Sequence, residues 1–565
     1  MTDTIGARLS PLGAFYQRER ELADEICCVQ PLPNGELVKL NWTEFGHQVR
    51  TLAAYLESLG LEPGSNIALM SSNCAYWIIA DLAIWMAGHT SVPIYPVLTG
   101  KSVRQILDHS GAKLMFAGKL EGWQGISAEL PEALPLITFP LPSSVPENAG
   151  TAWQQILTDF TPYPKSPERS LDEVATIIYT SGTTGMPKGV MHTFHNLAVV
   201  GVASGELYDM TPADRKISYL PLAHVAERAA IEVNQLYYGF RVYFSWSLET
   251  FGADLKRAKP TMLFAVPRIW TKFQQGVLGK MPANRLDRLL KIPFVSGRIR
   301  KKVLEGMGLD QVRIAVSGAA PLSTHLMDWY RSLGIDILEG YAMSENFAFS
   351  HATKPGEAKF GYVGTPSPGV VCKFSDDGEL LIKSPANTPG YYKEPELTAA
   401  LFDAEGYLRT GDTGELDAQG RLRITGRIKE IFKTSKGKYV APAPIEDKLL
   451  ANRDIEQVCV TGNSLPAPIA IAILSEAAIQ RLGTAGGKAQ IAEQLEKDLR
   501  QVNSQLDKHE NLSTLVVAAD LWSVENGFMT PTLKIKRTVL EKVYGGSFEQ
   551  WQGQSAAVVW ADKAL

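Results

Sequence analysis

Hydrophobic residues in the first half of the chain follow two alternating patterns. Short, β-branched apolar runs typical of buried strands are separated by longer runs typical of helices. Strands that alternate with helices in this way predict parallel βαβ units, with helices on both faces of a sheet. The strand-like runs are residues 67–71, 91–94, 113–117, 261–267 and 312–317, and the clearest helix-like run is 75–87.

The pattern changes twice toward the C-terminus. Short, charged, strand-like segments such as 379–383 and 420–424 dominate from Asp376 to Arg427 and indicate a smaller β-rich unit. After about Lys429 a new α+β pattern begins, with helices expected near 443–450 and 488–508. The predicted fold class is therefore α/β: a large N-terminal domain of doubly wound sheets (1–428) with a β-rich subdomain (about 365–428), and a small α+β C-terminal domain (429–565). Residues 119–170, rich in proline and polar residues, are expected to form irregular surface excursions.

Composition narrows the class of protein. A chain of 565 residues is too long for one core, so two to four structural units are expected. Its net charge of −4 argues against a dedicated nucleic-acid binder. The five cysteines form no C-x-x-C pair, which favours free thiols in a reducing cytoplasm, and the N-terminus resembles no secretory signal. The apolar stretch 76–95 is interrupted by Asp81 and Gly88, so a soluble protein is expected.

The most informative segment is residues 179–189, Tyr-Thr-Ser-Gly-Thr-Thr-Gly-Met-Pro-Lys-Gly. It follows the apolar, strand-like run 174–178. A loop of hydroxyls, glycines and a lysine after a strand offers backbone N–H groups, hydroxyl donors and a positive charge to phosphate oxygens. A Walker A loop is excluded, because Pro187 and Gly189 stand where that motif needs other residues. A flexible polar turn is the remaining alternative, and it does not account for this many hydroxyls beside a lysine.

Several further segments carry residues suited to chemistry. His224 lies at a turn before a helix-like run (225–238), where it could face a cleft or simply cap the helix. Tyr341 and Glu345 follow a strand-like run, and Tyr341 could equally be a core aromatic. The segments are 219–224 (Tyr-Leu-Pro-Leu-Ala-His), 317–322 (Ser-Gly-Ala-Ala-Pro-Leu), 339–346 (Glu-Gly-Tyr-Ala-Met-Ser-Glu-Asn), 407–412 (Tyr-Leu-Arg-Thr-Gly-Asp), 426–430 (Gly-Arg-Ile-Lys-Glu) and 528–537 (Phe-Met-Thr-Pro-Thr-Leu-Lys-Ile-Lys-Arg).

Together and in this order, the segments resemble the adenylate-forming superfamily of acyl-CoA synthetases, luciferases and peptide-synthetase adenylation domains. The amino-acid sequences of residues 220–228, 426–442 and 530–537 are similar to those of the long-chain fatty acyl-CoA synthetase branch. Two positions depart from the pattern of many relatives, because Ala342 and Leu533 stand where glycine is frequent. The resemblance implies an N-terminal AMP-binding domain and a C-terminal domain that rotates about a hinge at Lys429.

The resemblance also assigns roles to individual residues. It implies that Lys534, with Lys536 as second choice, acts with His224 in catalysis, and that Glu345 and the Thr184 hydroxyl hold Mg²⁺. Asp412 would accept hydrogen bonds from the ribose hydroxyls, Arg427 would contact ribose or phosphate, and Gly437 would line the tunnel for coenzyme A (CoA). The implied nucleotide-binding residues are Thr180, Ser181, Gly182, Thr183, Thr184, Gly185, Lys188, Gly318, Ala319, Gly340, Tyr341, Ala342, Ser344, Asp412 and Arg427.

The function implied is an ATP-dependent, AMP-forming fatty acid–CoA ligase. Its cofactors and substrates would be ATP, Mg²⁺, CoA and a fatty acid of long chain. The apolar and aromatic residues 236–246 could wall an acyl tunnel or belong to the core. The alternatives are a ligase for another carboxylic acid or for a carrier-protein phosphopantetheine, and, in a different class, an NTPase or phosphotransferase. A cytoplasmic location, transient contact with the inner membrane surface and a homodimer are further expectations.

Overall fold

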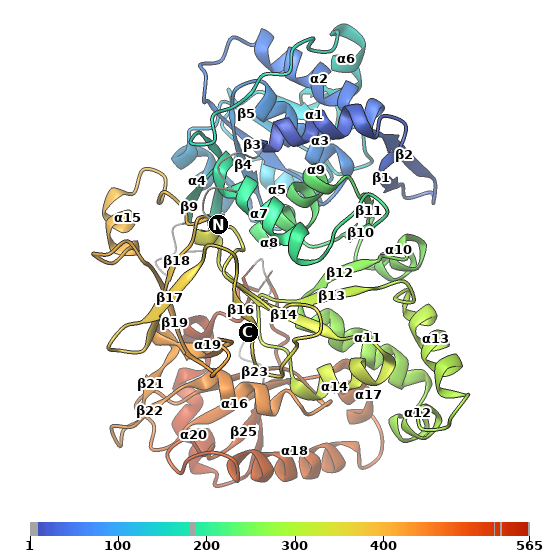
Figure 1. Ribbon diagram of the computed structural model, residues 1–565. Helices are drawn as coiled ribbons and strands as arrows, with labels where there is room; N and C mark the ends of the chain where they lie inside the picture. The colour runs from blue at the N-terminus through green and yellow to red at the C-terminus, as the bar shows by residue number, and fades with distance from the viewer. Residues whose placement is uncertain (1–8, 181–186, 525, 531–533, 563–565) are drawn as a thin grey trace.

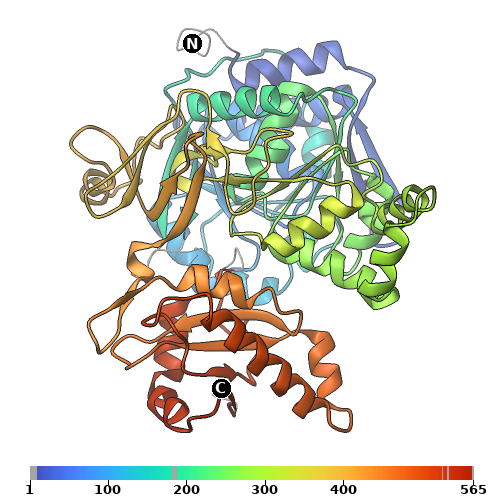
Figure 2. The same cartoon turned by 60° about the horizontal axis from the view of Figure 1, so that its bottom comes forward.

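The computed structural model describes residues 9–180, 187–524, 526–530 and 534–562. Figure 1 shows a large upper part, coloured blue to yellow, above a smaller part formed by the orange and red C-terminal residues. Figure 2, turned to bring the bottom forward, shows the C-terminal part as a separate layer against the larger one. Strands and helices alternate through most of the chain, which confirms the α/β fold class.

A seven-stranded sheet lies at the centre of the N-terminal part. Its strands are β3 (Asn66–Met70), β4 (Thr90–Ile94), β5 (Leu114–Ala117), β6 (Leu136–Thr138), β7 (Thr151–Ala152), β8 (Val174–Thr180) and β9 (Lys188–Thr193), and α3 (Ala75–Met86) and α4 (Gly100–Ser110) connect three of them. The order is β7-β6-β5-β3-β4-β8-β9, parallel except for β9. Ile67 and Leu69 pack with α3, whereas Ala68 and Met70 pack with α4. Because side chains alternate across a strand, helices cover both faces of this sheet, as predicted.

Two further sheets complete the upper part. One contains β1 (Ile26–Pro31), β2 (Leu37–Asn41), β10 (Arg215–Ser218) and β11 (Arg241–Phe244), and the other contains β12 (Met262–Ala265), β13 (Ile314–Ser317), β14 (Ile337–Tyr341), β15 (His351–Ala352) and β16 (Thr365–Pro366). Strands β12, β13 and β14 are parallel, so their carboxyl ends lie at one edge, where α/β proteins usually bind ligands.

The helices of the upper part surround these sheets. The predicted helix 225–238 is present as one continuous run with a π-helical middle: α8 (Val225–Arg228), η3 (Ala229–Val233) and α9 (Asn234–Tyr238). The others are α1 (Pro11–Glu21), α2 (Trp42–Ser58), α7 (Phe194–Leu207), α10 (Phe251–Ala258), α11 (Pro267–Lys280), α12 (Ala283–Leu290), α13 (Ser296–Met307) and α14 (Thr324–Leu333).

The prediction that residues 119–170 are irregular surface excursions is partly wrong. Strands β6 and β7 extend the central sheet, and two short helices, α5 (Trp123–Ser127) and α6 (Trp153–Asp159), lie beside them. Strands of two or three residues are too short to show an alternating pattern in the sequence. Trp153, which is fully buried, anchors the segment to the core.

The β-rich unit expected at about 365–428 contains a four-stranded antiparallel sheet, β17-β18-β19-β20. Its elements are β17 (Val371–Phe374), β18 (Glu379–Lys383), β19 (Leu408–Leu416), β20 (Leu422–Arg427) and the helix α15 (Pro395–Leu401). Buried and accessible residues alternate at the start of β19, so one face packs inward and the other meets solvent.

The C-terminal part has its own cores. It contains β21 (Phe432–Lys433), β22 (Tyr439–Val440), β23 (Ile455–Thr461), β24 (Ile469–Leu474), β25 (Leu515–Val517), β26 (Val558–Trp560), α16 (Pro442–Leu449), α17 (Glu476–Leu482), α18 (Gly487–Asn503), α19 (Arg537–Tyr544) and α20 (Phe548–Gly553). All of β24 is buried, with alternate residues in two separate cores that draw only on residues from Phe432 onward. The predicted boundary near Lys429 falls in the short 3₁₀-helix η5 (Ile428–Glu430) that precedes this part.

Contacts between the two parts include an ion pair and the packing of a helix against a strand. Arg268 at the start of α11 forms an ion pair with Glu456 of β23. Helix α16 also packs against β20. Across the described ranges no helix combines the length and the apolar character needed to cross a bilayer.

Candidate active site

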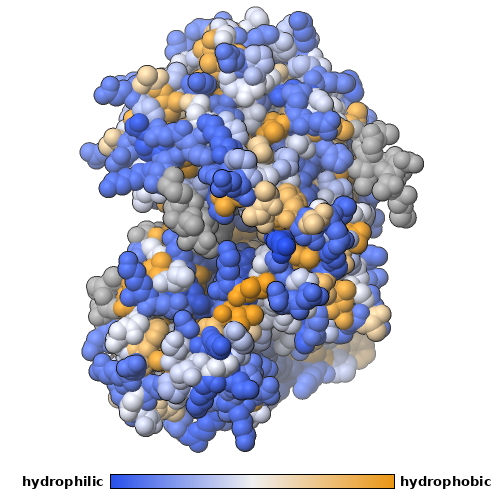
Figure 3. Space-filling view, turned by 90° about the vertical axis from the view of Figure 1, so that its left-hand side faces the viewer, coloured by the Kyte–Doolittle hydropathy of each residue, from blue (hydrophilic) through white to orange (hydrophobic). Residues whose placement is uncertain are grey.

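A cavity of about 1640 Å³ lies between the upper and the C-terminal part. Figure 3 shows the outline of the molecule notched between these two parts. The cavity is lined by the ends of β8, β13 and β14, by β20, and by the segment that leads into α19. Elements far apart in sequence therefore converge on one space, and most of the sequence-predicted site residues within the described ranges line it.

The phosphate-loop prediction falls partly outside the described residues. Ser181, Gly182, Thr183, Thr184 and Gly185 are not described. The two ends of the loop, Thr180 and Lys188, are opposite one another in the β8–β9 ladder, and both line the cavity.

Tyr391 contacts both Lys188 and Glu345, the two charged residues predicted to lie beside the phosphates. Tyr391 was not identified from the sequence. Its hydroxyl donates a 2.9 Å hydrogen bond to Glu345 Oε1, and the Lys188 ammonium lies 5.2 Å from its ring centroid. Burial raises the pKa of Tyr391, and the Glu345 carboxylate raises it further. The hydroxyl therefore stays protonated and orients Glu345. Adjacent tyrosines after a glycine, at 390–392, were the available signal.

Tyr341, Asp412 and Arg427 form a connected cluster. The Tyr341 hydroxyl donates a 2.6 Å hydrogen bond to Asp412 Oδ2, and Arg427 Nε donates one of 2.7 Å to Oδ1. Asp412 is buried, and Tyr341 and Arg427 line the cavity. Asp412 itself is not among the residues that line the cavity. Its carboxylate is held in one orientation by two residues that do line it, and the predicted acceptance of hydrogen bonds from ribose hydroxyls stays a prediction.

Small residues line the wall between β13 and β14. Gly318, Ala319, Gly340, Ala342 and Ser344 all contribute to the cavity surface. Ala319 has a φ of +69°, a left-handed conformation that costs free energy for a residue with a Cβ. Such strain is concentrated at binding sites, and here it turns the chain tightly around the cavity wall.

His224 both caps a helix and lines the cavity, so the two alternatives left open by the sequence hold together. Its Nδ1 accepts the backbone N–H of Ala226 at 3.2 Å, at the start of α8. Burial, with a smaller contribution from the nearby Lys534 ammonium, lowers the pKa of His224 to about 4. The ring is therefore neutral at pH 7. Because Nδ1 accepts, the proton of the neutral ring is on Nε2, which can donate to a bound carboxylate.

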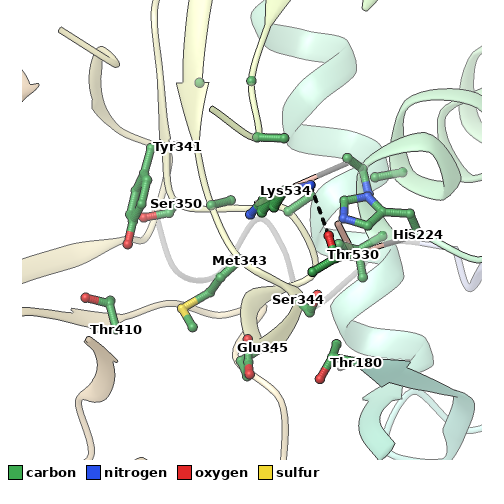
Figure 4. Close-up of a pocket in the computed structure, with 18 of the residues that line it drawn as sticks. Thr180, His224, Tyr341, Met343, Ser344, Glu345, Ser350, Thr410, Thr530 and Lys534 are labelled. Carbon is green, nitrogen blue, oxygen red and sulfur yellow. Dashed lines mark hydrogen bonds between the residues drawn. The ribbon is translucent and has the colours of Figure 1, made fainter. Parts of the chain in front are cut away.

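Lys534 comes from the C-terminal part and lies among groups of the upper part. Figure 4 shows it between Tyr341 and His224, with its backbone N–H donating to Thr530 Oγ1 at 3.0 Å. Its side chain keeps contact with the open cavity although protein groups surround it. Burial lowers its pKa and Arg427 lowers it further, whereas Asp412, Glu430 and Glu345 act in the opposite direction. Lys536, the second candidate, immediately precedes α19 as its N-cap and also lines the cavity.

The residues at the phosphate end suit Mg²⁺ rather than a metal held by protein ligands alone. Within the described ranges no cluster of three His, Cys, Asp or Glu side chains could hold a metal ion. Glu345 is half-buried, lines the cavity and has one oxygen engaged by Tyr391. Mg²⁺ is usually bound by one or two carboxylates together with substrate phosphates and water, so Glu345 fits that role.

An apolar arm of the cavity runs beside the helical segment that begins at His224. Val225, Ala229, Ile231 and Asn234 of this segment line it, and α7, β10 and β12 supply the opposite walls. The wall residues contributed by those three elements are Val200, Ala203, Ser204, Leu207, Lys216, Ile217, Met262 and Phe264. The ten residue-to-residue steps from His224 to Asn234 span about 15 Å at the helical rise.

Two charged residues line this mainly apolar arm. Burial lowers the pKa of Lys216 to about 7, and its ammonium donates to the Ala230 carbonyl at 2.9 Å. Burial raises the pKa of Glu227 to about 8. Glu227 accepts hydrogen bonds from the Ser218 hydroxyl and the Tyr219 backbone, both at 2.9 Å. Glu227 is thus tied to β10, while Lys216 remains the polar group of the arm's wall.

The aromatic residues at 236–246 belong to the core rather than to the tunnel wall. Leu236, Phe240 and Phe244 are fully buried within the main core. A Cβ on Gly205 of α7 would lie 1.8 Å from the Tyr238 ring, so this glycine makes room for an aromatic packed against the helix. Of the two interpretations the sequence left open, the structure supports the core.

The hinge and tunnel residues are separated. Lys429 in η5 lines the cavity. Gly437 lies in the turn between β21 and β22, with a φ of +77°, and is not among the residues lining the cavity. Its predicted place in a CoA tunnel stays a prediction for another arrangement of the two parts.

Comparison with known proteins identifies the family. Residues 15–392 match the AMP-binding enzyme family, and residues 429–550 match the AMP-binding enzyme C-terminal domain. The chain belongs to the AMP-binding enzyme family. The recognised resemblance to the adenylate-forming superfamily is thereby confirmed.

The curated relatives fall in the long-chain branch that the sequence suggested. One is a long-chain-fatty-acid–CoA ligase, FadD15, of Mycobacterium bovis, 29% identical over 97% of both chains. Another is the human long-chain-fatty-acid–CoA ligase 1, 28% identical over 85% of this chain and 77% of the human one.

Solved structures share the fold at lower identity. The adenylation domain of a carboxylic acid reductase from Segniliparus rugosus, in complex with AMP and a co-purified carboxylic acid, has a TM-score of 0.79 at 22% identity and covers 97% of this chain and 94% of its own. The anthranilate CoA ligase AuaEII, in complex with anthranoyl-AMP, has a TM-score of 0.77 at 19% identity and covers 95% and 98%.

Proposed function

We propose that this chain is an ATP-dependent long-chain fatty acid–CoA ligase. It would form acyl-AMP and pyrophosphate from a fatty acid and ATP, and then acyl-CoA and AMP. The observation that carries the proposal is the shared cavity, which combines the predicted nucleotide-binding residues, Lys534 and His224 with an apolar arm.

The chemistry requires two anions to meet. A carboxylate is a poor electrophile because its leaving group would be oxide. Attack of a carboxylate oxygen on the α-phosphate of ATP turns that oxygen into part of AMP, a good leaving group. The protein must position the anions and stabilise the charge that develops on phosphorus.

Three residues that line the cavity suit this task. Lys534 supplies a positive charge to both carboxylate and α-phosphate. Neutral His224 supplies a hydrogen-bond donor to the carboxylate without a second charge. Lys188 would hold the departing pyrophosphate together with the loop 180–185, and Mg²⁺ bound by Glu345 and Thr184 would supply charge neutralisation there.

The adenosine of ATP would bind beside the cluster of Tyr341, Asp412 and Arg427. Tyr341 would lie against adenine, with the small residues of the β13–β14 wall allowing close approach. Asp412, held by Tyr341 and Arg427, would accept the ribose hydroxyls. With adenine against Tyr341 and the ribose on Asp412, the α-phosphate would lie near Arg427 and Lys534.

A long acyl chain would occupy the arm beside the helical segment 224–234. Its walls are mainly aliphatic, and its length of about 15 Å exceeds what a short acid needs. The names of the curated relatives point in the same direction.

CoA is the proposed acyl acceptor. Rotation of the C-terminal domain about Lys429 would withdraw Lys534 and admit the thiol, with Gly437 brought to its tunnel. The domain division at Lys429, the homodimer and the cytoplasmic location stay predictions.

A product assay tests the proposal. Purified protein is incubated with ATP, Mg²⁺ and acids from short to very long chain, with CoA, with a phosphopantetheine carrier protein, or with neither. We expect acid-dependent pyrophosphate exchange without acceptor, and acyl-CoA with AMP when CoA is present, strongest for long chains. Transfer only to the carrier protein supports the alternative acceptor, and ADP with orthophosphate contradicts adenylation altogether.

A further inference from the structure

The tip of the α12–α13 hairpin combines exposed apolar residues with a high density of positive charge. This tip is defined here as residues 285–302. It contains seven basic residues and one acidic residue, in a chain whose net charge is −4. Figures 1 and 2 both show the hairpin at the outer edge of the N-terminal part, in yellow-green in Figure 2.

The turn between the two helices exposes every one of its residues. Lys291 to Val295 are all exposed, and Phe294 is 97% exposed. Ile292 and Val295 beside it are 44% and 37% exposed. A single exposed apolar residue needs no explanation, but three together at the tip of a projection mark an interaction surface.

The backbone at Phe294 adds an independent observation. Its φ is +65°, a left-handed conformation that glycine or asparagine adopts at lower cost. The turn is fixed by hydrogen bonds from the Val295 and Ser296 N–H groups to the Ile292 carbonyl. A phenylalanine here neither gains burial nor suits the backbone, so its presence contributes nothing evident to folding.

The positive charges surround this apolar turn. Arg298, Arg300, Lys301 and Lys302 follow it on α13, and Arg285 and Arg288 precede it on α12, all exposed. Among these side chains the described contacts include one ion pair with a carboxylate, between Lys301 and Glu305 at 3.8 Å. The charge of the tip is therefore largely uncompensated by its own surroundings.

We propose that the α12–α13 tip docks this protein on an anionic lipid bilayer, with Phe294, Ile292 and Val295 inserted at the headgroup level. Clustered lysines and arginines are attracted to the negative surface potential of such a membrane, and an exposed aromatic prefers the interface. Apolar insertion distinguishes a bilayer from a nucleic acid or an acidic protein, which would use the charges alone. Docking would bring the enzyme to the surface where fatty acids partition, but it depends on no step of the proposed reaction.

Vesicle co-sedimentation of the full chain tests the proposal. The probes are vesicles of phosphatidylglycerol mixed with phosphatidylcholine, and vesicles of phosphatidylcholine alone, at low and high salt. We expect binding only to the anionic vesicles, weakened by salt. Phe294→Asn, which also suits the local backbone, should lower the partition coefficient about 10-fold. Arg298→Gln, Lys301→Gln and Lys302→Gln together should lower it roughly 10- to 100-fold.

Matched controls separate docking from general effects. Leu521→Asn removes a residue that is 60% exposed on the C-terminal part, and Lys497→Gln, Arg500→Gln and Lys508→Gln together remove the same charge elsewhere. These controls should bind like the wild type, and all variants should keep pyrophosphate exchange. The proposal is overturned if the wild type does not bind anionic vesicles at low salt. It is also overturned if the control variants lose as much binding as the tip variants, or if Phe294→Asn binds as well as the wild type.

Discussion

The hydroxyl of Tyr341 donates a 2.6 Å hydrogen bond to Asp412, and this bond links the end of β14 to the β-rich unit. Arg427 engages the other oxygen of the same carboxylate. Tyr341 and Asp412 are far apart in sequence, and their contact joins two sheets at the wall where we propose that adenosine binds. Tyr341 can therefore contribute to this wall in two ways, through its ring and through the hydrogen bond that its hydroxyl donates to Asp412.

Tyr341→Phe separates these contributions. The ring is kept, but Asp412 loses one of its two donors, so we expect the KM for ATP to rise about 3- to 10-fold with little change in kcat. Steady-state kinetics with varied ATP measures this. Tyr163→Phe is the matched control, because Tyr163 also donates to a carboxylate, Glu57, outside the cavity. Equal effects of the two variants would contradict the assignment.

Lys534→Ala tests the proposed division of labour between half-reactions. Loss of one preorganised positive charge should slow adenylate formation on the order of 10²- to 10³-fold. Thiolysis of preformed acyl-AMP should be largely retained, because Lys534 would have left the cavity by then. Separate assays of pyrophosphate exchange and of acyl-CoA formation from synthetic acyl-AMP give the two rates.

Lys536→Ala is the control for that variant, since Lys536 lines the same cavity two residues away. A larger loss of adenylation in Lys536→Ala than in Lys534→Ala would reverse the assignment between the two lysines. Comparable losses in both half-reactions of Lys534→Ala would refute the proposed domain rotation.

Lys216→Met should change the preference for the acyl chain. The substitution replaces the polar group of the arm's wall by an apolar one of similar length, so a long chain loses an unfavourable neighbour. We expect the ratio of kcat/KM for a long acid to that for a short acid to rise on the order of 10-fold. Lys256→Met on α10, an exposed residue, is the control and should leave the ratio unchanged.

Glu339→Gln should alter the pH dependence of stability. Burial, with a smaller contribution from Asp447 of the C-terminal part, raises the pKa of Glu339 to about 7. In the unfolded chain the group ionises near its ordinary pKa of about 4.3, so the native state binds the extra proton between the two values. The free energy of unfolding should fall as pH rises through this window and level off above about 7.

The glutamine side chain does not titrate, so the variant should lose this slope. Thermal unfolding at about pH 5 and about pH 8 compares the two proteins. The variant should gain stability relative to the wild type at the higher pH. Parallel pH profiles would show that Glu339 is ionised throughout.

Contiguous motifs made much of the site predictable. The strand before residue 179, the helix after His224 and the lysines near 534 are local patterns, and each occurs where the sequence placed it. The order of the motifs identified the family before any distance was known.

Contacts between distant segments were not predictable in the same way. Tyr391 reaches both Lys188 and Glu345 only because the chain returns beside β9. The acyl arm is lined by α7, whose apolar faces look the same in sequence whether they meet the core or a cavity. Nothing in the sequence distinguishes Phe294 from a core residue, because its exposure and its positive φ are properties of the folded chain.

Transfer of oxygen from the acid to AMP tests the central claim most directly. A long-chain fatty acid labelled with ¹⁸O in both carboxylate oxygens is converted in the presence of ATP, Mg²⁺ and CoA, and the AMP is analysed by mass spectrometry. Attack of the carboxylate on the α-phosphate predicts one ¹⁸O atom in each AMP, with unlabelled pyrophosphate. AMP without the label, or ADP as the nucleotide product, would contradict the account.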